Sequence, residues 1–237
     1  MGVALNDLGR AVEAIDAYHM AIEARPDYAE AYRNLAKPLI GLDDIEGAIE
    51  ACTLALRIRP DYAAARWERA LPLLLAGRFD EAWEDTLARP VVDRKRFAQP
   101  TEPLPQDLAG KRVLLAGEQG LGDQIFFLRF AAALKARGAE VLARVDPKIA
   151  EIIAPVPFID RVLGPGEKPG QYDFALTLGD LPYLLGADDP PPPVAMMADD
   201  GRMSAMAARI GAFGPPPYIG VTWRAGINDT NRLYKEA

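Results

Sequence analysis

The sequence has few of the residues that build disulfides, zinc sites and membrane spans. Its 237 residues contain one cysteine, Cys52, and one histidine, His19, which excludes an intrachain disulfide and a Cys/His zinc site of the usual composition. No apolar run approaches the roughly 18 residues needed to cross a bilayer. The opening "MGVALNDLGRAVEAIDAY" lacks the basic-then-apolar order of a secretory signal. We therefore expect a cytoplasmic protein without a membrane span.

An excess of positive charge is also missing. The net charge is −7, and residues 1–94 carry 11 Lys/Arg against 17 Asp/Glu, a balance of −6. Residues 95–237 carry 16 against 17, a balance of −1. A general nucleic-acid binder would show a basic stripe. We expect no nucleic-acid partner.

An internal repeat dominates residues 1–94. "RPDYAEAYRNL" begins at Arg25 and "RPDYAAARWER" at Arg59, an offset of 34 residues, which is the period of tetratricopeptide repeats (TPRs). Ala48, Cys52 and Ala55 take the small, large and small packing places of a second helix, so Cys52 is expected to be an inert core thiol. The pattern predicts helix pairs that stack into a binding surface.

The repeats at the two ends of this array deviate from the pattern. Reading backward by 34 residues from the central unit places Ala14 and Tyr18 on the second helix of an earlier repeat, whose first helix would start before Met1. We therefore expect a truncated first repeat. Reading forward gives a third unit in which Trp67 stands one place late, typical of a cap that joins another domain. Tyr18, Trp67 and Trp83 are expected to be core residues, and His19 a surface residue.

After residue 94 the residue pattern changes twice. Residues 95–110 hold prolines at 100, 103 and 105 and are predicted to be an extended linker. From residue 111 short apolar runs alternate with helical segments: "KRVLLAG", "AEVLARV", "IDRVLG", "YDFALTL" and "PYIGVTW" are expected strands. "DQIFFLRFAAALKARG" is expected to be a helix of about four turns. The alternation predicts a parallel sheet, and so an α + α/β chain in which residues 111–237 form one Rossmann-like domain.

A glycine-rich loop joins the first of these strands to its helix. In "LLAGEQGLGDQIFFLRF" the spacing is G-x-x-G-x-G, which is neither the dinucleotide pattern nor a P-loop. Loops at the carboxyl ends of parallel strands carry the sites of open α/β sheets. A polar, anion-binding corner is therefore expected here, and a nicotinamide-type site is a weak alternative. The loop residues expected to bind ligand are Gly117, Gln119, Gly120, Gly122 and Gln124.

The loop also carries two carboxylates. Asp123 is either a first-turn acid that favours the helix dipole or a general base acting on a hydroxyl. Glu118 is the second candidate and could share or take that role. Such a combination of glycines and carboxylates suits a sugar or a phosphosugar better than an apolar ligand.

Together, the repeats, "RFAQP", "LAGKRVLLAGEQGLGDQIFFLRFAAALKARGAEV" and "YIGVTWRAG" resemble bacterial TPR glycosyltransferase-like proteins, which are similar to the heptosyltransferases (family 9-like). The family fold is GT-B, in which two Rossmann-like domains bind acceptor and nucleotide-sugar donor without a metal. The resemblance implies that residues 111–237 are the acceptor domain, with Asp123 as general base. It places Trp223, Arg224 and Arg232 beside the donor phosphates.

Two departures qualify that resemblance. Relatives usually carry an Arg-Ser pair after the last strand, whereas this chain has "RAGINDTNRLYKEA", and no donor domain follows. The chain is therefore expected to be an incomplete glycosyltransferase that is inactive in isolation, with a nucleotide-sugar as substrate and no cofactor or metal. The alternative is a non-catalytic TPR module that binds a protein partner and keeps a vestigial α/β domain. A nucleotide-binding regulator is a third, weaker alternative.

Overall fold

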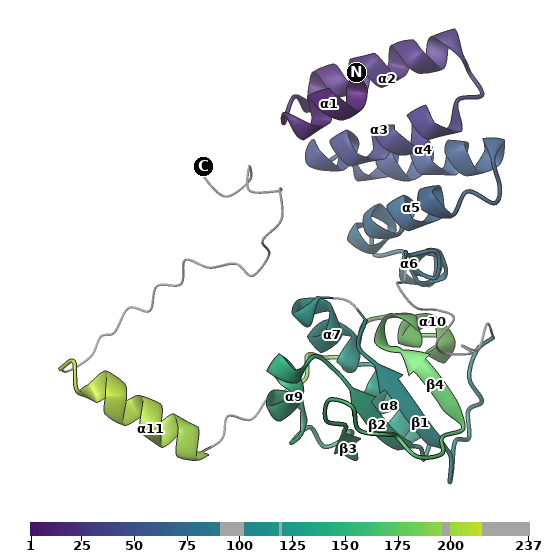
Figure 1. Ribbon diagram of the computed structural model, residues 1–237. Helices are drawn as coiled ribbons and strands as arrows, with labels where there is room; N and C mark the ends of the chain where they lie inside the picture. Colours follow the sequence, from purple (N-terminus) through teal and green to yellow (C-terminus); the bar gives the residue numbers. More distant parts are fainter. Residues whose placement is uncertain (91–101, 119, 196–199, 215–237) are drawn as a thin grey trace. The chain divides into compact units, whose positions relative to one another are not determined.

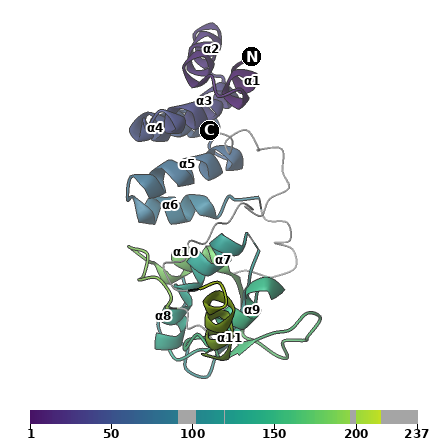
Figure 2. The same ribbon diagram turned by 90° about the vertical axis from the view of Figure 1, so that its left-hand side faces the viewer.

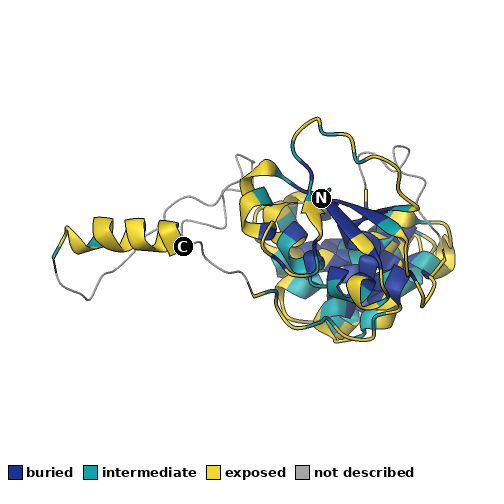
Figure 3. Ribbon diagram, turned by 90° about the horizontal axis from the view of Figure 1, so that it is seen from below, coloured by how far each residue is buried: buried dark blue, intermediate teal, exposed yellow. Residues whose placement is uncertain are grey.

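The computed structural model describes residues 1–90, 102–118, 120–195 and 200–214. The chain divides into two compact units, Met1–Met197 and Ala198–Ala237. In the second unit the described element is α11 (Asp200–Gly211), which buries no residue (Figure 3). The predicted strand "PYIGVTW" and the predicted donor-side residues Trp223, Arg224 and Arg232 lie outside the described residues.

The first 90 residues form the predicted helix pairs. The pairs are α1 (Gly2–Asp7) with α2 (Ala11–Ala24), α3 (Ala29–Gly41) with α4 (Ile45–Ile58), and α5 (Ala63–Leu75) with α6 (Phe79–Thr86), stacked one on the next (Figure 2). Small residues let neighbouring helices approach: Ala36 and Ala48 pack with Cys52, and all three are fully buried. Burial raises the pKa of Cys52 to about 12, as expected for an inert thiol.

The turns inside the pairs keep the repeat period in their backbone. Gly9, Asp43 and Gly77, each 34 residues after the last, have φ of 73°, 64° and 73°. A left-handed residue at this position reverses the chain between the two helices of a pair, and glycine adopts it without steric cost. Asp43 takes the same conformation with a side chain, and among the described residues it is the only non-glycine with positive φ.

Most of the burial predictions for the repeats are confirmed, and one is wrong. Tyr18 and Trp83 are buried, at 7% and 2% exposed, and His19 is exposed, as predicted. Trp67 is 37% exposed, so the prediction that it belongs to the core is wrong. Its place one residue late in the repeat turns its side chain off the packed face of α5.

A four-stranded parallel sheet follows, with β1 (Arg112–Ala116), β2 (Glu140–Arg144), β3 (Arg161–Val162) and β4 (Phe174–Thr177) in the order β3-β2-β1-β4 (Figure 1). Strands β1 and β2 are near-continuous buried apolar runs. Residues of four short helices share the main core cluster with Val113, Leu115 and Val141 of the sheet, whereas Leu114, Leu142 and Leu163 form a separate buried cluster. The helices are α7 (Leu121–Leu128), α8 (Ala131–Ala136), α9 (Pro147–Ile153) and α10 (Leu181–Leu185); a 3₁₀ turn, η2 (Leu178–Asp180), precedes α10.

Two local predictions differ from the structure. The expected four-turn helix is divided into α7 and α8 at Arg129, whose Nε donates to the Phe126 carbonyl while the backbone tightens to i→i+3 bonds. Part of the predicted linker belongs to the core: Leu104 and Leu108 are 4% and 0% exposed, and Leu104 N donates to the Leu184 carbonyl. The domain limits 1–94, 95–110 and 111–237 stay a prediction.

The last helix pair is built into the core of the sheet layer. Trp83 of α6 stacks on Phe79 at 5.9 Å between ring centroids and meets Phe127 and Phe130 edge to face at 6.4 and 5.7 Å. Aromatic pairs in these arrangements add about 0.5–1.5 kcal/mol each to the energy of burial. The cap predicted from the deviant third repeat therefore contributes its large side chain to the α/β core.

Candidate functional site

The carboxyl ends of β1 and β4 form the candidate site, because parallel neighbours end at the same edge of a sheet. The loop 117–120 and α7 follow β1, and η2 and α10 follow β4. Both connections contain the letters Leu-Gly-Asp, at residues 121–123 and 178–180. The site therefore begins with two aspartates on adjacent connections.

Asp123 lies in the first turn of α7 and is exposed. The helix begins after Gly120, and no side chain caps it. A Cβ built on Gly120 would stand 3.3 Å from Asp123 Oδ2, so the carboxylate folds back over the start of its own helix. This position satisfies the helix dipole and also leaves the carboxylate open to a ligand.

Glu118 has a different environment. Its side chain is 12% exposed and forms an ion pair with Arg89, whose Nε donates to Oε1 at 2.9 Å and whose Nη2 donates to the same oxygen. Burial raises the pKa of Glu118, and the positive charge of Arg89 opposes that rise. The second candidate base is thus already engaged by a cation of its own chain.

Asp180 completes this buried cluster. Its Oδ1 accepts a bond of 2.5 Å from Arg89 Nη1, and its Oδ2 accepts one of 2.8 Å from Thr177 Oγ1. The side chains of Arg89 and Asp180 are 3% and 5% exposed. Sequence analysis did not identify Arg89 or Asp180 as site residues.

The predicted ligand-binding residues Gly117 and Gln124 form a packed pair. Gln124 is 5% exposed, and its Oε1 accepts a bond of 3.0 Å from the Asp146 amide. A Cβ on Gly117 would stand 2.2 Å from that oxygen, so only glycine fits beneath it. The side-chain amide of Gln124 thereby joins the first turns of α7 to the loop after β2. Gly120 and Gly122 are exposed, and Gln119 lies outside the described residues.

Asp146, which follows β2, is the N-cap of α9. Its Oδ1 accepts a bond of 2.9 Å from the amide of Lys148, and Pro147 occupies the first helical position. The carboxylate of Asp146 thus has a structural role at the start of α9.

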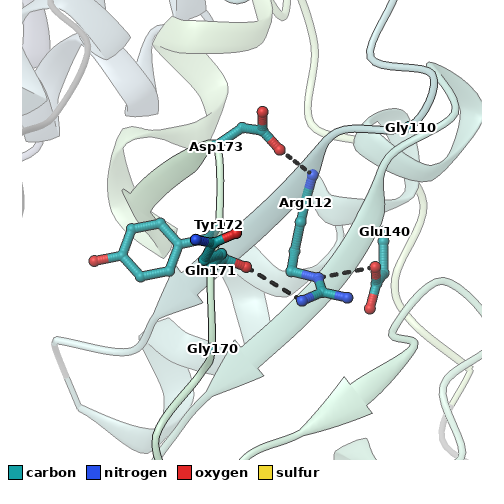
Figure 4. Close-up of a pocket in the computed structure, with 7 residues that line it drawn as sticks. All are labelled: Gly110, Arg112, Glu140, Gly170, Gln171, Tyr172 and Asp173. Carbon is teal, nitrogen blue, oxygen red and sulfur yellow. Dashed lines mark hydrogen bonds and ion pairs between the residues drawn. The ribbon is translucent and has the colours of Figure 1, made fainter.

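The opposite edge of the sheet also has a hollow, of about 620 Å³ (Figure 4). Arg112 crosses it, with Nε 2.9 Å from Glu140 Oε2 and Nη1 3.2 Å from the Gln171 carbonyl. The Arg112 amide donates to Asp173 Oδ2 at 2.9 Å. These charges pair across the amino ends of β1, β2 and β4. Its lining residues are Gly110, Arg112, Glu140, Gly170, Gln171, Tyr172 and Asp173.

Within the described ranges, no group of three or more His, Cys, Asp or Glu side chains is arranged to hold a metal ion. No helix in that part of the chain is long and apolar enough to cross a membrane.

Comparisons with known proteins relate the chain to two kinds of neighbour. No protein-family model matches it. Protein FlbA of Caulobacter vibrioides is 29% identical over 254 residues, which cover 95% of this chain and 42% of that protein. The chain thus spans less than half the length of this curated relative.

Solved structures match more loosely. The first TPR domain of Spaghetti (RPAP3), bound to an HSP90 peptide, is 25% identical, covers 37% of this chain and 69% of its own, and has a TM-score of 0.36. A mutant of the Thermobaculum terrenum O-GlcNAc transferase is 21% identical, covers 68% of this chain and 32% of its own, and has a TM-score of 0.34. Likenesses at this level support no inference about function. The helix pairs, their 34-residue period and the positive-φ residues at their turns form a TPR-like fold, which a small parallel sheet follows.

Proposed function

We propose that the parallel sheet is the Rossmann-like acceptor domain of a GT-B glycosyltransferase, and that Asp123 is its general base. The observation that carries the proposal is the contrast among three carboxylates at one edge of the sheet. Glu118 is partly buried and Asp180 is buried, and both are bound to Arg89, whereas Asp123 is exposed. Asp123 is therefore the carboxylate of this group that an incoming hydroxyl can reach.

The proposed reaction is a direct displacement at the anomeric carbon of a nucleotide-sugar. The Asp123 carboxylate takes the proton of the acceptor hydroxyl as the hydroxyl oxygen bonds to the anomeric carbon. The bond between that carbon and the nucleoside diphosphate breaks in the same step. Positive charge offsets the charge that develops on the leaving group. Arg224 and Arg232 are the proposed source of that charge, with Trp223 beside them, and the proposal includes no metal.

The exposed start of α7 suits this chemistry. Gly120 and Gly122 carry no side chain that would hinder a sugar, and a Cβ at Gly122 would meet no atom within 4 Å. The packed pair of Gly117 and Gln124 holds the loop from below. The nucleotide-sugar and the hydroxyl-bearing acceptor are the proposed substrates.

The test is turnover in the complete protein, including the proposed donor domain. Nucleoside diphosphate release is measured with UDP-, GDP- and ADP-linked sugars. Asp123→Asn is expected to lower the rate by about 10²-fold or more, the range of general-base effects, without changing the melting temperature. Asp107→Asn, a carboxylate in an exposed turn on another loop, is the matched control and is expected to keep full turnover. Full turnover in Asp123→Asn would exclude the base assignment.

A second candidate function, the binding of a protein partner by the repeats, is favoured by one observation. Trp67, Leu71 and Leu75 are spaced four residues apart, so they share one face of α5, and they are 37%, 52% and 57% exposed. One repeat earlier, the same face of α3 carries Arg33 and Lys37. An aromatic and aliphatic stripe beside two cations fits a peptide that has both acidic and apolar side chains.

This candidate is tested by fluorescence polarisation with labelled peptides that combine acidic and aromatic residues. Trp67→Ala with Leu71→Ser is expected to raise the Kd by about 30-fold or more, because truncation of an aromatic hot spot costs about 2 kcal/mol or more. Met20→Ser, which removes an apolar side chain that is 63% exposed on α2, is the matched control. Equal binding by all three proteins would exclude this surface.

A further inference from the structure

Arg89 is a buried cation that the proposed chemistry does not use. It lies three residues beyond the end of α6, the second helix of the last TPR helix pair. Its backbone amide donates to the Thr86 carbonyl at 3.1 Å. Its side chain is 3% exposed. A charged side chain at this depth is retained only where its hydrogen bonds and its charge are compensated.

Every N–H of its guanidinium has an acceptor. Nε donates to Glu118, Nη1 donates to Asp180 and to the Thr86 carbonyl, and Nη2 donates to Glu118 and to Thr177 Oγ1 at 2.9 Å. Five donors in a fixed planar fork are what arginine offers and lysine does not. The contacts therefore depend on the geometry of the guanidinium as well as on its charge.

These acceptors belong to three separate segments. Thr86 ends α6, Glu118 follows β1, and Thr177 ends β4, with Asp180 just beyond it. A Cβ on Gly179 would stand 3.0 Å from Arg89 Cζ and from Glu118 Oε1, so glycine leaves the room that the guanidinium occupies. One side chain of the TPR part thus joins the two connections at the carboxyl edge of the sheet.

The helix that presents Arg89 is itself fixed. Trp83 anchors α6 among the aromatic side chains of α7 and α8, and Arg69 of α5 holds Asp85 of α6 with Nε 2.6 Å from Oδ2. The Asp85 side chain is 3% exposed. The last helix pair is therefore a rigid support from which the guanidinium reaches the loop.

Glu118 stands two residues before Gly120, the N-cap of α7. We propose that Arg89 is a positioning residue: by holding Glu118 against Thr177 and Asp180, it fixes the start of α7 and so the place of the Asp123 carboxylate. The inference rests on the proposed function for its effect on turnover, but not for its effect on the loop. It makes the last TPR helix pair part of the site that the sheet presents.

Arg89→Lys tests this, because it keeps the charge and removes the fork. Hydrogen exchange is measured by mass spectrometry on the complete protein, together with nucleoside diphosphate release. Amides of residues 120–124 are expected to exchange about tenfold faster, while those of the central strands β1 and β4 keep their protection. Turnover is expected to fall by about 10²-fold at unchanged KM for the donor, as for a displaced catalytic group.

Arg112→Lys, at the other edge of the sheet, is the matched control and is expected to change neither readout. If Arg89→Lys leaves the exchange of residues 120–124 unchanged, or raises exchange equally throughout the sheet, Arg89 is not a positioning residue. If the loop is loosened while the wild type shows no transfer with any donor, the positioning role stands and the proposed function fails. Should Arg89→Lys not fold, Thr177→Val removes one acceptor and is expected to give the same local pattern at smaller size.

Discussion

The two Leu-Gly-Asp segments of this chain follow neighbouring parallel strands and have opposite environments. In the segment after β4, Leu178 and Asp180 are 1% and 4% exposed. In the segment after β1, Leu121 is 37% exposed and Asp123 is exposed. The same three letters therefore build the core in one place and an open corner in the other. Arg89 accounts for the difference: it binds Asp180 of one segment, whereas near the other it binds Glu118 and not Asp123.

The largest expected difference between the segments is at their leucines. Leu178 belongs to the main core cluster, so Leu178→Ala is expected to lower the free energy of unfolding by about 2–5 kcal/mol. Leu121→Ala removes a side chain that is already partly in water and is expected to cost about 1 kcal/mol or less. Urea denaturation of the two variants measures both values. Equal losses would show that the segment after β1 is packed like its neighbour.

Alanine substitutions of the two glycines, Gly179 and Gly122, are expected to change stability less than the leucine substitutions do, and in opposite directions. An added Cβ at Gly179 meets the guanidinium of Arg89 at 3.0 Å, so Gly179→Ala is expected to destabilise by about 1–3 kcal/mol through overpacking. An added Cβ at Gly122 meets nothing within 4 Å, and alanine is the better helix former by about 1 kcal/mol. Gly122→Ala is therefore expected to raise the melting temperature. A fall of similar size in both variants would contradict this contrast.

The smallest expected effect is a dependence of stability on pH. Burial raises the pKa of Glu118 above its ordinary 4.5, although Arg89 opposes the rise. Between 4.5 and the raised pKa the native state binds more protons than the unfolded state, so this group makes stability fall as pH rises through that window. In Glu118→Gln this contribution is absent. The free energy of unfolding of the wild type relative to that of Glu118→Gln is expected to fall as pH rises through this window. A difference that does not change with pH would refute the interpretation.

The sequence predicts repetition and alternation well, because both are local. The helix pairs within each 34-residue repeat and the strands at 112–116 and 140–144 follow from patterns among adjacent residues. The buried cluster could not be predicted in this way, because Arg89 meets partners 29 and 91 residues further along the chain. No pattern distinguishes it from the other arginines that follow amphipathic helices. For the same reason the sequence could not show that Glu118, the second candidate base, is held by a cation.

The exchange of one oxygen for nitrogen at each aspartate tests the contrast most directly. Asp180→Asn weakens charge-assisted bonds in the core and is expected to lower the free energy of unfolding by about 1.5–3 kcal/mol. Asp123→Asn is expected to change it by about 0.5 kcal/mol or less, as at an exposed site, and to remove turnover from the complete protein. Both variants are measured by urea denaturation and by nucleoside diphosphate release. An Asp123→Asn protein that is as destabilised as Asp180→Asn, or that retains full turnover, would contradict the account.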